Sequence, residues 1–128
     1  MAIDVKYPTI TEDTLMFTKG CEGMVLNISK SHNPSQLQIV MANNSNYTTI
    51  YGIGWILYTK KDSNWVVCEP NFIFEDIGRA MYPDQKDTLY IPLNQFKKPL
   101  ESGSYKLVKD ITLNNKECTL TKYFKMEL

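Results

Sequence analysis

The sequence is poor in the groups that most catalytic and metal-binding sites need. It has one histidine, His32, three cysteines and no Cys-x-x-Cys pair in 128 residues. Structural zinc sites usually take four Cys or His ligands in closely spaced pairs. The segment Gly52-Ile53-Gly54 lacks the third glycine and the following helix of a phosphate-binding loop. We therefore expect no metal site and no cofactor.

The sequence also lacks an excess of charge and a long apolar run. Fourteen basic and fourteen acidic residues cancel, so no overall field concentrates nucleic acid around the protein, and no nucleic-acid partner is expected. No run reaches the length of a membrane span, and the first twenty residues lack the pattern of an export signal. The location is extracellular or at the cell surface if a signal has been removed, and cytoplasmic otherwise.

The three cysteines are too few for a disulfide-dense scaffold. Cys21 and Cys118 flank the body of the chain, so one disulfide between them is one alternative. Three thiols, including Cys68, are the other. Composition favours the three thiols.

What the sequence has is an apolar pattern of period two, the repeat of an extended strand. In "SQLQIVMANNS", Leu37, Ile39 and Met41 alternate with Gln36 and Gln38 before turn residues close the run. This predicts a half-buried strand. A chain of this length fits one domain.

The strongest hairpin signal is "YTTIYGIGWILYTKKDSNWVVCEP", in which two aromatic and β-branched runs flank the polar turn 60–64. The bulkier face should point inward, which places Gly52 and Gly54 outside, where another segment can approach closely. The residues of the inward face are Tyr51, Ile53, Trp55 and Leu57.

Similar runs recur along the rest of the chain. They lie near residues 24–29, 37–41, in the two hairpin arms, and around Leu89, Tyr105 and Thr119. Seven short strands predict an all-β fold, a two-sheet antiparallel sandwich, with an eight-stranded barrel as the alternative. Pro92 indicates an edge position or a bulge, and Lys122 is the one misfit in the apolar phase of the last run.

Two segments do not fit the strand pattern. Residues 1–20 are expected to form a lead-in or a strand added to one edge, before a sandwich that spans residues 21–128. The segment "FEDIGRAM" is the only candidate for a helical turn, which Gly78 weakens.

The stretch "LESGSY" predicts a corner between the two sheets. A tyrosine at the start of the penultimate strand can hydrogen-bond through its hydroxyl to backbone a few residues upstream, as in the tyrosine corner of Greek-key sandwiches. We assign this role to Tyr105. Gly103 would supply backbone freedom for the bend, and Leu100 would close the end of the core.

The chain resembles the bacterial immunoglobulin-like domains of many low-GC Gram-positive proteins. The matching features are a strand that ends in Asn, a Tyr-Gly before the hairpin, a Trp after its turn and Leu-x-x-Gly-x-Tyr late in the chain. Lys106 stands where arginine is usual, and Ser63-Asn64 where Asp-Gly is common. The resemblance implies an immunoglobulin-like Greek-key sandwich on an exported or lipid-anchored protein, without catalytic residues. The matching residues are Asn43, Tyr51, Gly52, Trp65, Leu100, Gly103 and Tyr105.

Two groups of residues are candidates for catalysis. His32 lies in the polar loop "SKSHNPSQ", without a recognisable nucleophile, so a solvated loop histidine is favoured. The acidic cluster lacks the spacing of a calcium loop, so a solvated charged turn is favoured over a calcium site or a hydrolase. Its members are Glu75, Asp76, Asp84 and Asp87.

Large surface aromatics remain as candidates for binding, although cross-strand pairing in a sheet can also explain them. The candidates are Tyr58, Trp65 and Tyr82. We therefore expect a non-enzymatic module that binds another protein at the bacterial cell surface, with carbohydrate as the alternative ligand. The rival is a small intracellular inhibitor of a host enzyme, for example one encoded by a phage. A hydrolase that uses the acidic cluster is the least favoured.

Overall fold

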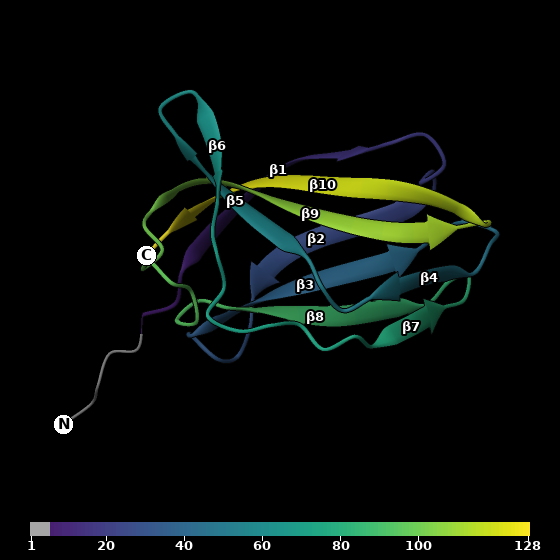
Figure 1. Cartoon of the computed structure of the whole chain (residues 1–128), viewed down its shortest axis with the longest axis horizontal. Helices are drawn as coiled ribbons and strands as arrows, with labels where there is room; N and C mark the ends of the chain where they lie inside the picture. Colours follow the sequence, from purple (N-terminus) through teal and green to yellow (C-terminus); the bar gives the residue numbers. More distant parts are fainter. Residues whose placement is uncertain (1–5) are drawn as a thin grey trace.

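The computed structural model describes residues 6–128, and within that range all regular structure is β. The larger sheet has the order β1-β10-β9-β4-β7, and in it β5 also pairs with β9 and β6 with β5; the smaller sheet has the order β2-β3-β8 (Figure 1). The strands are β1 (Thr9–Phe17), β2 (Met24–Lys30), β3 (Gln36–Asn43), β4 (Thr49–Gly52), β5 (Ile56–Lys61), β6 (Asn64–Val67), β7 (Gly78–Met81), β8 (Lys86–Pro92), β9 (Gly103–Leu113) and β10 (Lys116–Glu127).

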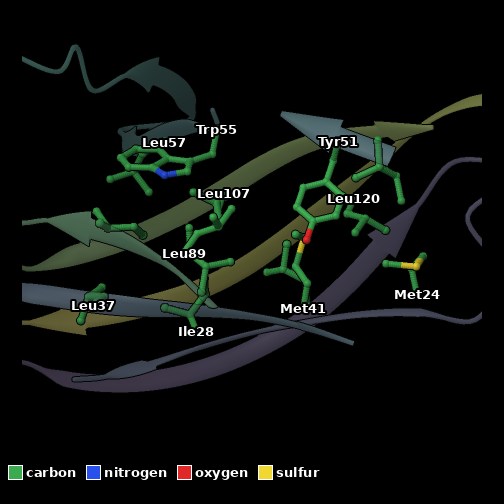
Figure 2. Packing of buried hydrophobic residues seen from close by; sticks show 14 of the residues in the cluster. Met24, Ile28, Leu37, Met41, Tyr51, Trp55, Leu57, Leu89, Leu107 and Leu120 are labelled. Atoms are coloured by element: carbon green, nitrogen blue, oxygen red, sulfur yellow. The ribbon is translucent and has the colours of Figure 1, made fainter. Parts of the chain in front are cut away.

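The two sheets stack as an all-β, immunoglobulin-like sandwich, which confirms the predicted fold class. The period-two pattern explains why: alternate residues of each strand are buried, and their apolar side chains fill the space between the sheets. Figure 2 shows side chains from both sheets meeting there, among them Leu107 and Leu120 from the larger sheet and Ile28, Leu37 and Met41 from the smaller.

The expected hairpins are present, with one difference in the first. The β5–β6 hairpin turns at Asp62, which has a φ of 57°, and β9 and β10 join through Asn114 and Asn115, also at positive φ. Asn and Asp tolerate this conformation better than most residues. The first predicted arm is divided into β4 and β5, which both pair with β9.

A buried lysine lies at the gap between β4 and β5. The Nζ of Lys109, on the inward face of β9, donates hydrogen bonds to the carbonyl oxygens of Gly52 and Gly54, the second at 2.5 Å. Gly54 is also overlain by the Phe74 ring, 3.5 Å from where a Cβ would lie. Polar groups freed by the break in the ladder are thus satisfied from inside the core.

Two segments for which the sequence allowed a helical turn or an irregular lead-in contain β-strands instead. The "FEDIGRAM" segment contains no helical turn; its second half forms β7, paired with β4, because tertiary pairing outweighs a weak local preference. Residues 9–17 form β1, an edge strand antiparallel to β10. The division of the chain at residue 20 stays a prediction.

Lys122 points inward, as its phase in β10 requires, and its ammonium pairs with Glu12 at 3.7 Å. The same carboxylate accepts the backbone N–H of Ile28 at 2.7 Å. Glu12 of β1 therefore links the last strand of the larger sheet to the edge of the smaller one. Pro92 ends β8, an edge strand, as predicted.

A disulfide joins Cys21 and Cys118, with Cα atoms 5.7 Å apart. The composition-based preference for three thiols is therefore wrong. The two residues are 97 positions apart in the sequence, and only the pairing of β1 with β10 shows that the fold brings them together. Cys68 is the free cysteine.

Candidate functional site

The β5–β6 hairpin places two of the predicted binding aromatics on the outer face of the larger sheet. Tyr58 and Trp65 lie on the same side of the hairpin, because Tyr58 pairs with Val67 and Lys60 with Trp65. Tyr58 also lies opposite Lys106 of β9, which lies opposite Tyr123 of β10. Figure 1 shows this hairpin projecting above the sandwich, near the end at which the C-terminus lies.

These side chains form an aromatic–lysine cluster, defined here as Tyr58, Lys60, Trp65, Lys106 and Tyr123. The rings of Trp65 and Tyr123 have centroids 5.7 Å apart. The Nζ of Lys106 lies 4.9 Å from the centre of the Tyr58 ring and 5.0 Å from that of Trp65, and the Nζ of Lys60 lies 5.9 Å from Trp65. These are cation–π distances.

The ammonium groups of the cluster have no carboxylate partner in the part of the chain that the structure describes. The ion pairs there join Arg79 to Asp87, Lys97 to Glu69 and Lys122 to Glu12. Lys60 and Lys106 are therefore positive charges that only aromatic rings and solvent accommodate.

An exposed aliphatic row lies beside the cluster on the same face. The row crosses four strands: Thr121 of β10 pairs with Met16 of β1 and with Val108 of β9, and Val108 pairs in turn with Ile56 of β5. Met16 is 55% exposed and Ile56 44% exposed. Exposed apolar side chains that extend across several strands are typical of interaction surfaces.

The outer face of the smaller sheet is different. Its outward residues are mainly polar and include Asn27, Ser29, Gln36, Gln38, Lys86 and Thr88, beside Val25, Val40, Ala42 and the exposed Tyr90. The larger sheet differs in that several aromatic rings and an aliphatic row gather on its outer face.

A groove of about 630 Å³ lies between the β5–β6 hairpin and the segment 97–102. Lys60, a member of the cluster, also lines this groove together with Val67 of the same hairpin. The groove is therefore continuous with the cluster. Burial raises the pKa of the Cys68 thiol, which lines the groove as well. The thiol therefore stays protonated at neutral pH and is a poor nucleophile.

Tyr82, the third predicted aromatic, does not join the cluster. It follows β7, is 60% exposed, and its backbone N–H donates to the side-chain oxygen of Gln85 at 2.8 Å. The sequence did not single out Tyr123 or Lys106 as residues of a binding site. The signal was the register of the last two strands, which sets both beside Tyr58.

The residues predicted to form the corner lie at the start of β9. Tyr105 is buried and its hydroxyl donates to the carbonyl oxygen of Glu101, four residues upstream. Leu100 packs against the core as a partly buried residue. Gly103 is not among the residues at positive φ, so the bend does not use the backbone freedom that was expected of it.

The acidic residues do not form one site. Asp87 accepts hydrogen bonds from the Tyr51 hydroxyl, at 2.5 Å, and from Arg79. Although burial opposes it, these hydrogen bonds lower the pKa of Asp87, so the carboxylate stays ionised and links the two sheets. Within residues 6–128, no group of three or more His, Cys, Asp or Glu side chains is placed to hold a metal. The remaining members, Glu75, Asp76 and Asp84, are exposed.

The comparisons with known proteins agree with the fold. A family model described as a bacterial Ig-like domain matches residues 21–125. This range contains β2 to β9 and all but the last two residues of β10, and it leaves out β1. Domains of this kind are typically non-catalytic. A search of the curated proteins found no match. None of the described residues forms a helix of the length and apolar character that a membrane crossing requires.

Proposed function

Because the chain belongs to the family of bacterial Ig-like domains, we propose that it is a non-catalytic module that binds another protein at the bacterial cell surface. The observation that carries the proposal is the aromatic–lysine cluster with its neighbouring aliphatic row. Aromatic residues surrounded by exposed apolar side chains are the usual anchors of protein interfaces. The outer face of the smaller sheet is more polar and carries the exposed Tyr90 where the larger sheet carries a cluster of aromatic rings.

The disulfide supports a location outside the cytoplasm. Disulfides form and persist in oxidising compartments, whereas cytosolic thiols are kept reduced. The bond between Cys21 and Cys118 therefore favours an exported domain over the intracellular inhibitor considered as the rival function.

The binding face can be tested by site-specific photo-crosslinking. A photoreactive amino acid at Ile56, beside the cluster, should give a discrete crosslinked protein when the domain is added to envelope fractions of a bacterium that encodes it. The same group at Gln38, on the outer face of the smaller sheet, is the matched control and should give none. Excess unlabelled domain should compete, and the Trp65→Ala variant should compete poorly.

Three results would contradict the proposal. One is equal crosslinking from both faces. Another is an absence of protein crosslinks together with retention of the domain on purified cell-wall glycan, which would identify carbohydrate as the ligand. A third is a crosslink to a cytoplasmic enzyme that the domain inhibits, which would favour the intracellular role.

A further inference from the structure

We infer that the partner presents an acidic segment to the β5–β6 hairpin, with carboxylates that pair with Lys60 and Lys106 and an apolar side chain that packs on Trp65 and Tyr123. This inference rests on the proposed protein-binding function and specifies the chemistry of the partner. Its basis is the charge left unpaired around the hairpin.

Lysines outnumber acidic residues at the hairpin and its groove. Five lysines lie there, against the carboxylates of Asp62, Glu69 and Glu101. Only one of the five has an ion-pair partner within the described part of the chain: Lys97, 3.2 Å from Glu69. The lysines are Lys60, Lys61, Lys97, Lys98 and Lys106.

The aromatic rings hold the ammonium of Lys106 in place for a ligand. Its Nζ is about equally close to the Tyr58 and Trp65 rings. Lys106 is only partly buried, so a carboxylate can still reach it. A charge-assisted hydrogen bond forms there without competition from an intramolecular partner. The adjoining Trp65 and Tyr123 rings, in contact with each other, offer an apolar platform to a neighbouring side chain.

The site extends to both sides of the hairpin. Lys60 lies over Trp65 in the cluster and also lines the groove, in which Lys61 and Lys98 lie. A segment with several carboxylates can therefore reach the cluster and the groove together. This spacing of cations favours a chain with repeated acidic residues over a single carboxylate.

Two other occupants fit the charge less well. A second copy related by a two-fold axis through the cluster would bring Lys60 and Lys106 close to their own counterparts, and like charges would oppose the contact. A nucleic acid would meet a protein whose basic and acidic residues balance, so no overall positive field would draw a polyanion to the site.

Trp65 provides a local reporter for the test. The chain has two tryptophans, and Trp55 is 5% exposed inside the core, so a soluble ligand changes the emission of Trp65 first. The full chain is titrated with a ten-residue peptide of Glu and Ser around a central Leu, and with a matched peptide in which Gln replaces Glu. We expect the acidic peptide to bind at least tenfold more tightly, and its affinity to fall as salt is raised from 50 to about 300 mM.

Variants locate the binding. Lys60→Gln together with Lys106→Gln should weaken the acidic peptide about tenfold or more. Lys116→Gln should leave its affinity unchanged, because Lys116 lies at the β9–β10 turn, at the other end of the sandwich from the hairpin (Figure 1). Thermal unfolding of each variant checks that the fold is intact.

Equal affinity for the Glu and Gln peptides, or no binding of either at millimolar concentration, would overturn the inference. So would a dimer in sedimentation that the double variant strengthens, or tighter binding of a single-stranded oligonucleotide than of the peptide. Failure here combined with face-specific protein crosslinking from Ile56 would leave the proposed function standing with a partner of different chemistry. Failure of both experiments would remove the proposed function as well.

Discussion

At the scale of single residues, the buried Lys109 is the most unusual feature of the core. Its side chain is 2% exposed, points inward from β9 and bonds to the carbonyl oxygens of Gly52 and Gly54. Its Nζ also lies 5.6 Å from the centre of the Tyr51 ring. A lysine is kept in this apolar interior because the gap between β4 and β5 leaves carbonyl groups that need a donor.

Burial lowers the pKa of Lys109 from 10.5 to about 8. Between these values the unfolded chain binds more protons than the folded one, so the free energy of unfolding should rise with pH through this window. We expect the Lys109 contribution to be about 1 to 2 kcal/mol between pH 7.5 and 9.5. Urea titrations at several pH values measure it as the difference between wild type and Lys109→Met.

Wild type must be compared with the variant because Cys68 also affects the pH profile. Burial raises the pKa of this thiol, so its contribution to the free energy of unfolding falls as pH rises through the same window. Lys116→Met, at an exposed turn position, is the control and should keep the wild-type profile. An identical pH profile for wild type and Lys109→Met would show that Lys109 does not titrate with a lowered pKa.

At the scale of elements, the segment 93–102 connects the smaller sheet to the larger one. The chain leaves β8, passes through residues 93–102 and enters β9, where Tyr105 is buried and stacks on Phe124 with ring centroids 5.7 Å apart. Its hydroxyl bonds to the carbonyl of Glu101 within this same connection. We propose that this bond fixes the angle at which β9 enters the sheet.

Tyr105→Phe should therefore lower the free energy of unfolding by about 1 to 3 kcal/mol, because the Glu101 carbonyl loses its partner while the ring packing is kept. Tyr123→Phe is the matched control on the neighbouring strand; its ring lies on the outer face, and the change should stay within about 0.5 kcal/mol. Denaturant titration of both variants measures the difference. Equal effects of the two substitutions would count against the corner.

The sequence was most informative where one element could be read alone. Alternation predicts β3, β9 and β10 because each buries every second residue, and it predicts that Tyr51, Trp55 and Leu57 point inward. It does not reveal the division of β4 from β5, because that gap depends on the side chain of Lys109 in β9, which is 57 residues from Gly52 and 55 from Gly54 in the sequence.

The candidate site shows the same limit. Tyr58 and Trp65 could be selected because a two-strand hairpin fixes which residues share a face. Lys106 and Tyr123 join them only through the pairing of β5 with β9 and of β9 with β10. A large exposed aromatic such as Tyr82 looks the same in the sequence as Trp65, because single residues carry no information on which strands become neighbours.

At the scale of the whole molecule, the disulfide closes most of the chain into one loop. It bonds residues 97 positions apart, and β2 to β9 lie between the two cysteines. Such a cross-link restricts the unfolded chain, and removal of a native disulfide typically costs about 2 to 5 kcal/mol. Thiol titration of the denatured, unreduced protein should find one free thiol, that of Cys68.

We expect Cys21→Ser with Cys118→Ser to lower the free energy of unfolding by about 2 to 5 kcal/mol, and reduction of the wild type to have a similar effect. The measurement is denaturant unfolding with and without reductant. Cys68→Ser is the control, and it should remain sensitive to reductant. Three titratable thiols, or a stability that reductant does not change, would show that the bond is absent in solution.

The position of this bond next to the β1–β10 ladder sets how the domain would respond to stretching. Thr9 pairs with Glu127 at one end of the ladder and Phe17 with Leu120 at the other, just before the two cysteines. Tension that enters through the two flanking segments would therefore separate the residue pairs of β1 and β10 one after another, starting at Thr9 and Glu127. The separation would stop at the disulfide. The strands between the two cysteines would carry no load, so the domain would lengthen by a short, fixed amount before the covalent link bears the tension.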